Sequence, residues 1–221
     1  MASPSELVSL RNECAFPDFK RISSDFELPP DDDFYDLSSE RPIFHWCLLG
    51  QVMQIIYFGR LRLDVKDKAG KSLVVAFYTD RDYHHPQLRV GSTIAILHPR
   101  QHYFMDGSVG IRLEAWDNVK IFPMALDEML RLSDRVQQYA TEDNGEKACQ
   151  GCDRKSSSLS RCAKCTLFSY CDRDCQAVAW NEKGHKADCK VLRDADFQGL
   201  LRLDWEVFDD YHRFSVDPRA E

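Results

Sequence analysis

Nothing in the sequence of 221 residues suggests a segment that crosses a membrane or directs export. Its longest apolar stretch, residues 43–58, is interrupted by His45, Gly50, Gln51 and Gln54, and is therefore too polar for a transmembrane helix. The first six residues contain neither the basic region nor the apolar region of a signal peptide. We therefore expect a soluble intracellular protein without a membrane partner, located in the nucleus or the cytoplasm, with its cysteines reduced.

The common signatures of catalysis are missing as well. The chain has no glycine-rich phosphate-binding loop, no nucleophile elbow, and no motifs that would supply a spaced general acid and base. The sequence therefore predicts no catalytic residues, and we expect a protein that acts by binding rather than an enzyme.

Cysteine, in contrast, is abundant and concentrated in one stretch. Seven of the nine cysteines and one histidine lie between residues 149 and 189. Eight such ligands make two tetrahedral sets, one of four thiolates and one of three thiolates with an imidazole, and zinc prefers both sets. A disulfide framework is the alternative, but it requires an oxidising compartment. The spacing is Cys149-x2-Cys152-x9-Cys162-x2-Cys165-x5-Cys171-x3-Cys175-x9-His185-x3-Cys189.

This stretch resembles the MYND-type zinc finger in more than its ligands. Tyr170 directly precedes a cysteine, and Gln176 and Trp180 follow Cys175 with the spacing Cys-Gln-x3-Trp. The HIT-type finger usually lacks that element, and RING fingers place their histidine in the middle of the motif. The resemblance implies two structural zinc ions per chain with interleaved ligation, whereas spacing alone leaves sequential pairing open. In the implied arrangement Cys149, Cys152, Cys171 and Cys175 hold one ion, and Cys162, Cys165, His185 and Cys189 hold the other.

The resemblance also implies a protein-interaction module that binds short proline-containing peptides. Gln176 and Trp180 are four residues apart, so on a helix they would share one face. An indole offers a flat apolar platform for proline, and an amide can bond the peptide's free carbonyl groups. The alternative is that Trp180 fills the small core between the zinc sites.

Basic residues within the finger have a simple explanation. Seven thiolates and two Zn²⁺ ions carry a charge of −3, which the balance of +3 in residues 149–190 offsets. These side chains can also donate hydrogen bonds to the sulfur ligands. The charge of the finger therefore does not predict contact with nucleic acid.

The remaining chain divides into segments of different character. Residues 1–40 have a balance of −7 and predict a largely irregular acidic arm, although Phe16, Phe19 and Phe26 can pin parts of it to the body. Residues 41–125 have a net charge of +4, and their pattern predicts strands. Residues 126–148 are predicted to form a linker helix followed by a polar break. The finger occupies residues 149–189. Dense apolar positions among aspartates then predict a helical tail over 190–221, in which Trp205 and Phe208 pack on the finger, the barrel or a partner.

The strands predict a small antiparallel barrel, so the fold class is α+β. Five strands are expected, and the first is long with a glycine that permits a bend. The pattern Leu88-x-Val90-Gly91-Ser92-Thr93-Ile94-Ala95-Ile96 resembles the second half of an OB-fold, while an SH3-like barrel or an open roll stays an alternative. Alternation of polar and apolar residues predicts these inward side chains: Leu63, Val65, Val74, Ala76, Ile94, Ile96 and Ile111.

An OB-like barrel raises a second functional hypothesis, the binding of single-stranded nucleic acid. Such folds use basic and aromatic side chains on their second and third strands and in their loops. A balance of +4 is small for a site that neutralises several phosphates, and aromatic residues in a short barrel usually fill its core. We therefore prefer the protein-interaction adaptor. The candidates for the second hypothesis are Arg60, Arg62, Phe77, Tyr78 and Tyr103, with Arg100, His102 and Phe104 nearby.

The other histidines do not predict a further metal site. His84, His85, His98 and His102 have no carboxylate or cysteine at ligand spacing. Paired histidines in loops are usually solvated, and we expect the same here.

Overall fold

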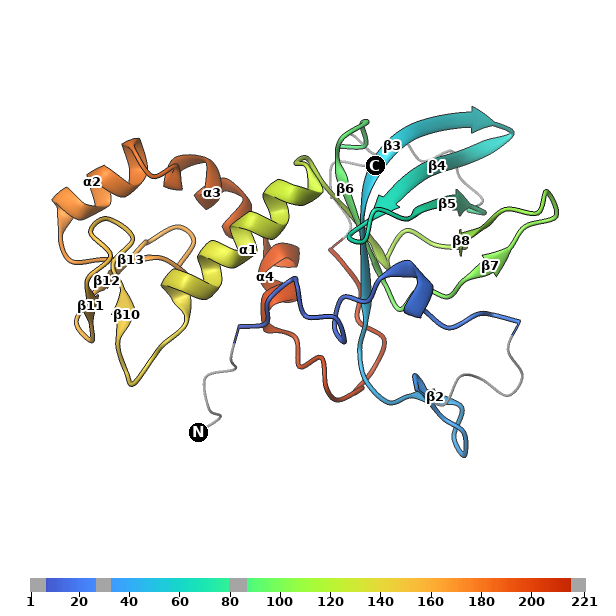
Figure 1. Cartoon of the computed structure of the whole chain (residues 1–221), viewed down its shortest axis with the longest axis horizontal. Coiled ribbons are helices and arrows are strands. Elements are labelled where there is room, and N and C mark those ends of the chain that lie inside the picture. Colours follow the sequence, from blue (N-terminus) through green and yellow to red (C-terminus); the bar gives the residue numbers. More distant parts are fainter. Residues whose placement is uncertain (1–6, 27–32, 80–86, 216–221) are drawn as a thin grey trace. The chain divides into compact units, whose positions relative to one another are not determined.

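The computed structural model describes residues 7–26, 33–79 and 87–215 (Figure 1). The chain forms two compact units. One comprises Met1–Arg11 and Leu130–Leu203 and contains the cysteine-rich stretch, so we call it the finger unit. The other comprises Asn12–Met129 and Asp204–Glu221, and we call it the barrel unit. None of the helices in the described ranges is long and apolar enough to cross a lipid bilayer.

The barrel unit is built on one sheet of seven strands in the order β7-β8-β5-β4-β3-β6-β9. Strands β3 and β4 form a long twisted hairpin, in cyan in Figure 1. All neighbouring strands are antiparallel except β5 and β8, which run parallel. The strands are β3 Cys47–Phe58, β4 Arg60–Asp67, β5 Ser72–Phe77, β6 Thr93–Leu97, β7 His102–Tyr103, β8 Val109–Leu113 and β9 Val119–Phe122.

The α+β class is confirmed, but the predicted barrel was wrong in its closure. The prediction was five antiparallel strands in a closed ring, and the structure has one parallel pair and no hydrogen bonds between the end strands β7 and β9 within the described residues. The fifth strand, which the sequence predicts over residues 109–121, breaks in two because residues 114–118 leave the sheet. Its first half, β8, pairs with β5, and its second half, β9, pairs with β6. The continuous segment 109–122 thus pairs with β5 near one end of the strand order and with β6 near the other end, as in a partly open OB-like barrel.

The core of the barrel unit follows the alternation of the strands with one exception. Leu63, Ile94 and Ile96 are fully buried in the main apolar cluster, as predicted. In β5 the cluster contains Leu73, Val75 and Phe77, whereas the predicted inward residues Val74 and Ala76 are buried outside it. This strand is apolar on both faces, so alternation gives no information about which face points inward.

The described part of the N-terminal arm is largely irregular, yet it is packed rather than solvated. Its regular elements are the 3-10 helix η1 (Phe19–Arg21), strand β1 (Tyr35–Asp36) and its partner β2 (Arg41–Pro42). Phe16 and Phe19 are buried, and the backbone N–H of Phe19 donates to Asp67 at 2.9 Å. Phe26 is 62% exposed, although its ring lies 5.8 Å from the rings of His102 and Tyr103. Burial of the other two phenylalanines outweighs the acidic composition of the arm.

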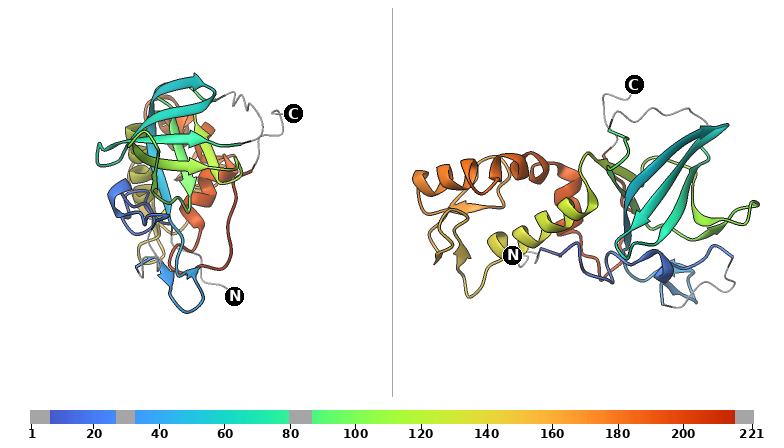
Figure 2. Two further views of the ribbon diagram at one scale, coloured as in Figure 1. Left: turned by 90° about the vertical axis from the view of Figure 1, so that its right-hand side faces the viewer. Right: turned by 45° about the horizontal axis from the view of Figure 1, so that its top comes forward.

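The finger unit contains two short hairpins followed by three helices, which Figure 2 shows in yellow to red. Strands β10 (Lys147–Ala148) and β11 (Lys155–Ser156) form the first hairpin, and β12 (Ser160–Arg161) and β13 (Ser169–Tyr170) the second. The helices are α2 Arg173–Asn181, α3 His185–Leu192 and α4 Ala195–Arg202. The predicted linker helix is α1, Leu126–Ala140, whose first four residues belong to the barrel unit.

The helical tail was predicted over 190–221, and the helix in fact ends at Arg202. From residue 203 to 215 the chain is irregular and its aromatic residues join the barrel unit. The carbonyl of Trp205 accepts the N–H of His45 at 3.0 Å, and its ring lies 4.6 Å from that of Phe16. Because its backbone carbonyl is paired with His45, Trp205 does not continue the helix.

Candidate metal centre

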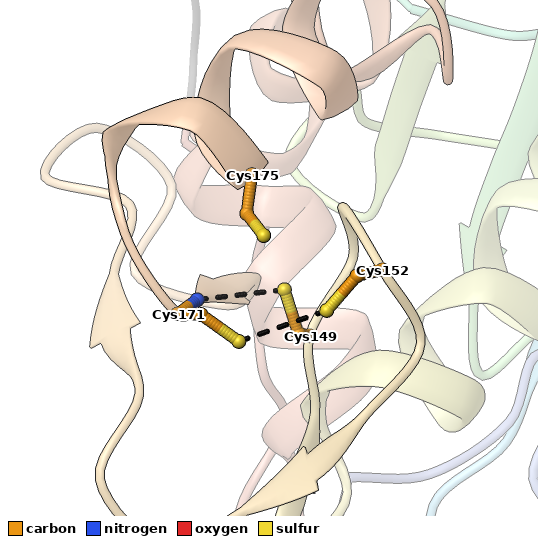
Figure 3. Close-up of side chains that lie close together, drawn as sticks. All are labelled: Cys149, Cys152, Cys171 and Cys175. Atoms are coloured by element: carbon orange, nitrogen blue, oxygen red, sulfur yellow. Dashed lines mark hydrogen bonds between the residues drawn. The ribbon is translucent and has the colours of Figure 1, made fainter.

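Four cysteines converge on the first candidate site, and their sulfur atoms point toward a common centre in Figure 3. Cys149 and Cys152 flank the turn after β10, Cys171 follows β13, and Cys175 lies in the first turn of α2. The Sγ atoms of Cys152 and Cys171 are 3.7 Å apart, and all four Sγ atoms lie within 4.8 Å of one another. A tetrahedral zinc ion with bonds of about 2.3 Å separates its sulfurs by about 3.8 Å, so the observed spacing fits zinc.

The second candidate site is fully buried. Its ligand atoms come from Cys162, Cys165, His185 and Cys189, and all lie within 4.8 Å of one another. The Sγ atoms of Cys162 and Cys189 are 3.9 Å apart, and His185 Nε2 lies 3.4 Å from Cys162 Sγ. Burial lowers the pKa of His185, which favours the neutral imidazole that a metal ion requires. The two sets therefore fit two structural zinc ions, and the geometry brings the ligands together in the interleaved order that the resemblance implied.

Residues around the first site hold its ligands in place. Asp172 caps helix α2 by accepting the N–H of Cys175 at 2.8 Å, which fixes where that sulfur enters the site. The Arg154 guanidinium donates to the sulfur of Cys152 at 3.4 Å and lowers the pKa of this thiol to about 6. A lower pKa favours the thiolate, which is the form that binds zinc. Arg154 thus plays the sulfur-bonding role expected for basic residues of the finger.

Helix α1 is tied to the finger by contacts that sequence reasoning missed. Arg135 makes two parallel hydrogen bonds to the carboxylate of Asp188, at 3.0 and 2.7 Å. The hydroxyl of Tyr139 donates to Asp153 at 2.7 Å. The pairs are 53 and 14 residues apart in the sequence, and no local pattern connects them.

The predicted peptide-binding pair lies on α2. Gln176 is exposed and Trp180 is partly buried. The indole ring of Trp180 lies 5.7 Å from the ring of the zinc ligand His185, and Lys164 Nζ lies 5.5 Å from its centroid. Trp180 therefore contacts the metal centre and still presents part of its surface to solvent.

The candidate nucleic-acid residues differ in their burial and in their contacts. Phe77 is a core residue, buried in the main cluster, so its assignment to a binding surface was wrong. Arg62 is paired with Asp106 at 2.8 Å. Arg60 stacks on Tyr78, with its guanidinium carbon 3.7 Å from the ring centroid. Tyr103 is 54% exposed.

The nearby loop candidates are engaged in other contacts. Arg100 donates to the carbonyl of Ser24 at 2.7 Å. His102 Nδ1 lies 2.6 Å from a carboxylate oxygen of Asp25, and its ring lies 4.8 Å from that of Phe104. His84 and His85 lie outside the described residues.

Comparisons with known proteins agree with the geometry of the finger. Residues 149–189 match the family described as MYND finger. A segment of 58 residues is 33% identical to "SET domain and MYND-type zinc finger protein 6" of Schizosaccharomyces pombe, covering 26% of this chain and 12% of that protein. A segment of 45 residues is 38% identical to human "Histone-lysine N-methyltransferase SMYD1", covering 20% of this chain and 9% of that protein.

Three solved structures match part of the chain at low sequence identity and low TM-score. The chain is 13% identical to S. pombe Pot1pC bound to ssDNA, over 48% of this chain and 99% of that one, with a TM-score of 0.31. The S. pombe Stn1–Ten1 complex is 17% identical over 43% of this chain and 80% of that one, with a TM-score of 0.29. Replication Protein A bound to ssDNA is 12% identical over 48% of this chain and 78% of that one, with a TM-score of 0.30. Ligand geometry and family match agree for one segment of the chain: residues 149–189 are a MYND-type zinc finger.

Proposed function

We propose that this chain is a protein-interaction adaptor without catalytic activity, and that its MYND finger binds short proline-containing segments of a partner protein. One observation carries the proposal: Gln176 and Trp180 occupy one face of α2, which starts beside a zinc ligand. The named activity of the human methyltransferase is not carried over, because the similarity spans only 9% of that protein.

The rigidity of this face supports peptide binding. Cys175 anchors the first turn of α2 to the metal site, and the Asp172 cap holds the same turn from outside. The ring of His185 supports one side of Trp180. A side chain that is already ordered loses little conformational entropy when a ligand binds, so the indole is a favourable platform for proline.

The polar groups beside the platform would orient the peptide. The amide of Gln176 is exposed one turn away, where it can both donate to and accept from a peptide backbone. A polyproline segment exposes its carbonyl groups because it has no internal hydrogen bonds. The ammonium group of Lys164, 5.5 Å from the indole centroid, lies at the same platform and favours peptides without a positive charge at that point.

The test measures binding of a panel of proline-containing peptides to the full chain by isothermal titration calorimetry. We expect Trp180→Ala to abolish binding and Gln176→Ala to weaken it by about 0.5–1.5 kcal/mol, the value of one hydrogen bond. Glu182→Ala is the matched control, because this exposed residue follows α2 on the opposite side. Zinc content is measured for each variant. Loss of zinc in Trp180→Ala would assign this residue a structural role and refute the proposal.

A second function is favoured by one specific contact in the barrel unit. The ring of Tyr78 is stacked with two guanidinium groups, Arg60 at 3.7 Å and Arg112 at 4.2 Å. Arg60 lies on β4, Arg112 lies on β8, and Tyr78 directly follows β5, which lies between these two strands in the sheet, where OB-folds bind oligonucleotides. Planar guanidinium groups stack on unpaired bases and neutralise phosphates.

A salt series with single-stranded oligonucleotides tests this second function. If Arg60 and Arg112 each contact a phosphate, their replacement by alanine lowers the slope of log K against log salt by about 0.7 per residue. Absence of binding by the unmodified protein at low salt would exclude it.

A further inference from the structure

Besides the two ligand sets of the finger, the described residues contain a third group of metal-ligating side chains, and it lies in the barrel unit. His45 Nε2 lies 3.0 Å from Asp209 Oδ1, and His212 Nε2 lies 2.8 Å from the same oxygen. The three donor atoms are all within 4.8 Å of one another. His45 lies two residues before β3, whereas the other two residues belong to the irregular segment 203–215.

His45 is held rigidly in this cluster. It is fully buried, and its other ring nitrogen, Nδ1, lies 2.8 Å from His98 Nε2. The rings of Phe208 and His212 pack against it at 5.0 and 4.8 Å. Its backbone N–H donates to the carbonyl of Trp205. These contacts fix the direction in which Nε2 of His45 points. Residues that do not touch the metal ion orient metal-bound histidines in the same way, through the other ring nitrogen.

We propose that His45, Asp209 and His212 bind one divalent transition-metal ion of the zinc type, and that this ion fastens residues 204–215 to the rest of the barrel unit. Two imidazoles and a carboxylate are a donor set that such ions bind, with water in the fourth position. The side chains of Asp209 and His212 are 69% and 41% exposed, so the ion can enter from solvent and keep a bound water.

The spacing of the donor atoms is close to what an ion requires. Ligands at about 2.0–2.1 Å in a tetrahedral arrangement are about 3.3 Å apart. The two shortest separations in the cluster, 2.8 and 3.0 Å, are hydrogen-bond lengths that need to open by a few tenths of an ångström. Asp209 is exposed and His212 is half-buried, so both can provide this adjustment, whereas His45 is buried and remains fixed.

His98, which contacts His45 through its ring, has an unusual backbone conformation. Its φ of 49° is in the left-handed region, which side chains other than glycine rarely adopt. Asparagine tolerates this region as well, but its shorter side chain does not reach His45. His98→Asn therefore removes the outer hydrogen bond while preserving the backbone, and we expect it to weaken metal binding by about 10- to 100-fold.

The experiment titrates zinc chloride into the full chain, with both finger sites already loaded, and follows uptake by isothermal titration calorimetry. Wild type should take up one further ion. Asp209→Ala and His212→Ala should lose it, and both positions are exposed enough for the fold to persist, which circular dichroism checks. Asp210→Ala is the matched control, because it removes a neighbouring exposed carboxylate outside the cluster, and it should bind as wild type does. No further uptake by wild type, or unchanged uptake by Asp209→Ala, would overturn the proposal.

Cobalt provides a second measurement that does not depend on the variants. A Co²⁺ ion bound by two nitrogens and one oxygen gives visible bands without the intense thiolate charge-transfer absorption of a cysteine site. Added to the zinc-loaded protein, Co²⁺ should produce the sulfur-free spectrum. Thiolate charge transfer instead would place the ion in the finger and refute the assignment.

Discussion

The turn between the first two zinc ligands provides the sharpest test of the metal geometry. Gly151 lies between Cys149 and Cys152, and a Cβ atom at this position would lie 2.4 Å from the carbonyl oxygen of Cys175 and 2.7 Å from its Cα. Both contacts are with backbone, so no flexible side chain can move aside. Gly151→Ala must therefore push the turn that carries two ligands away from the helix that carries a third.

The magnitude follows from the cost of overpacking, about 1–3 kcal/mol for an added carbon in a tightly packed position. Because zinc binding and folding of such a segment are coupled, the strain appears as a loss of zinc affinity. The expected loss is roughly 5- to 150-fold at the four-cysteine site. The Cys162–Cys165–His185–Cys189 site, which the added carbon does not contact, should be little affected.

Cadmium-113 NMR of the substituted protein resolves the two sites, because ligation by four sulfurs and by three sulfurs with a nitrogen gives different chemical shifts. Chelator competition followed on each resonance then measures the two affinities separately. Gly199→Ala is the matched control: its added Cβ meets no atom within 4 Å, and in helix α4 the change should stabilise by about 0.5–1 kcal/mol. Wild-type affinity at both sites in Gly151→Ala would refute the described packing of the turn.

Three further predictions concern stability. Leu63→Ala should destabilise the barrel unit by about 2–5 kcal/mol in chemical denaturation, because Leu63 is fully buried. Chelation of zinc, or Cys171→Ser, should unfold residues 149–189 while the barrel unit keeps its own thermal transition, as far-ultraviolet circular dichroism would record. Burial and the Asp153 carboxylate raise the pKa of Tyr139 to about 12. Its contribution to stability is therefore complete below about pH 10 and lost as the pH rises to about 12, and Tyr139→Phe should abolish that alkaline dependence and the matching phenolate absorbance change.

The two-zinc finger was predictable because its ligands are recognised by residue type and sequence spacing, without knowledge of how the helices and strands pack. Cysteine and histidine at these spacings have few alternative uses in a reduced protein, and the eight residues suffice to predict two ions. The contacts that fasten the finger to α1 were not predictable. Arg135 and Asp188 are ordinary charged residues on separate helices, and their pairing depends on how those helices pack.

The barrel was predictable in its strands but only partly in their arrangement. Alternation located Leu63 in the core because β4 has one apolar face and one polar face. It failed for β5, whose residues 73–77 are all apolar and buried, so that Val74 and Val75 are indistinguishable in the sequence. It also failed to show the break between β8 and β9, because a strand that changes partners keeps the same local pattern on either side of the break.

The segment after α4 was also mispredicted, because its contacts are with residues that are distant in the sequence. Aspartates and aromatic residues at close spacing predict a helix with an apolar face, and Ala195–Arg202 is such a helix. Beyond it, Trp205 and Phe208 have backbone partners at residues 43–45, and these partners lie more than 150 residues earlier in the sequence. That pairing brings Asp209 and His212 to His45 and converts three unremarkable residues into a candidate metal site. A search for metal ligands by spacing therefore finds the finger and misses this cluster, since the fold alone brings its members together.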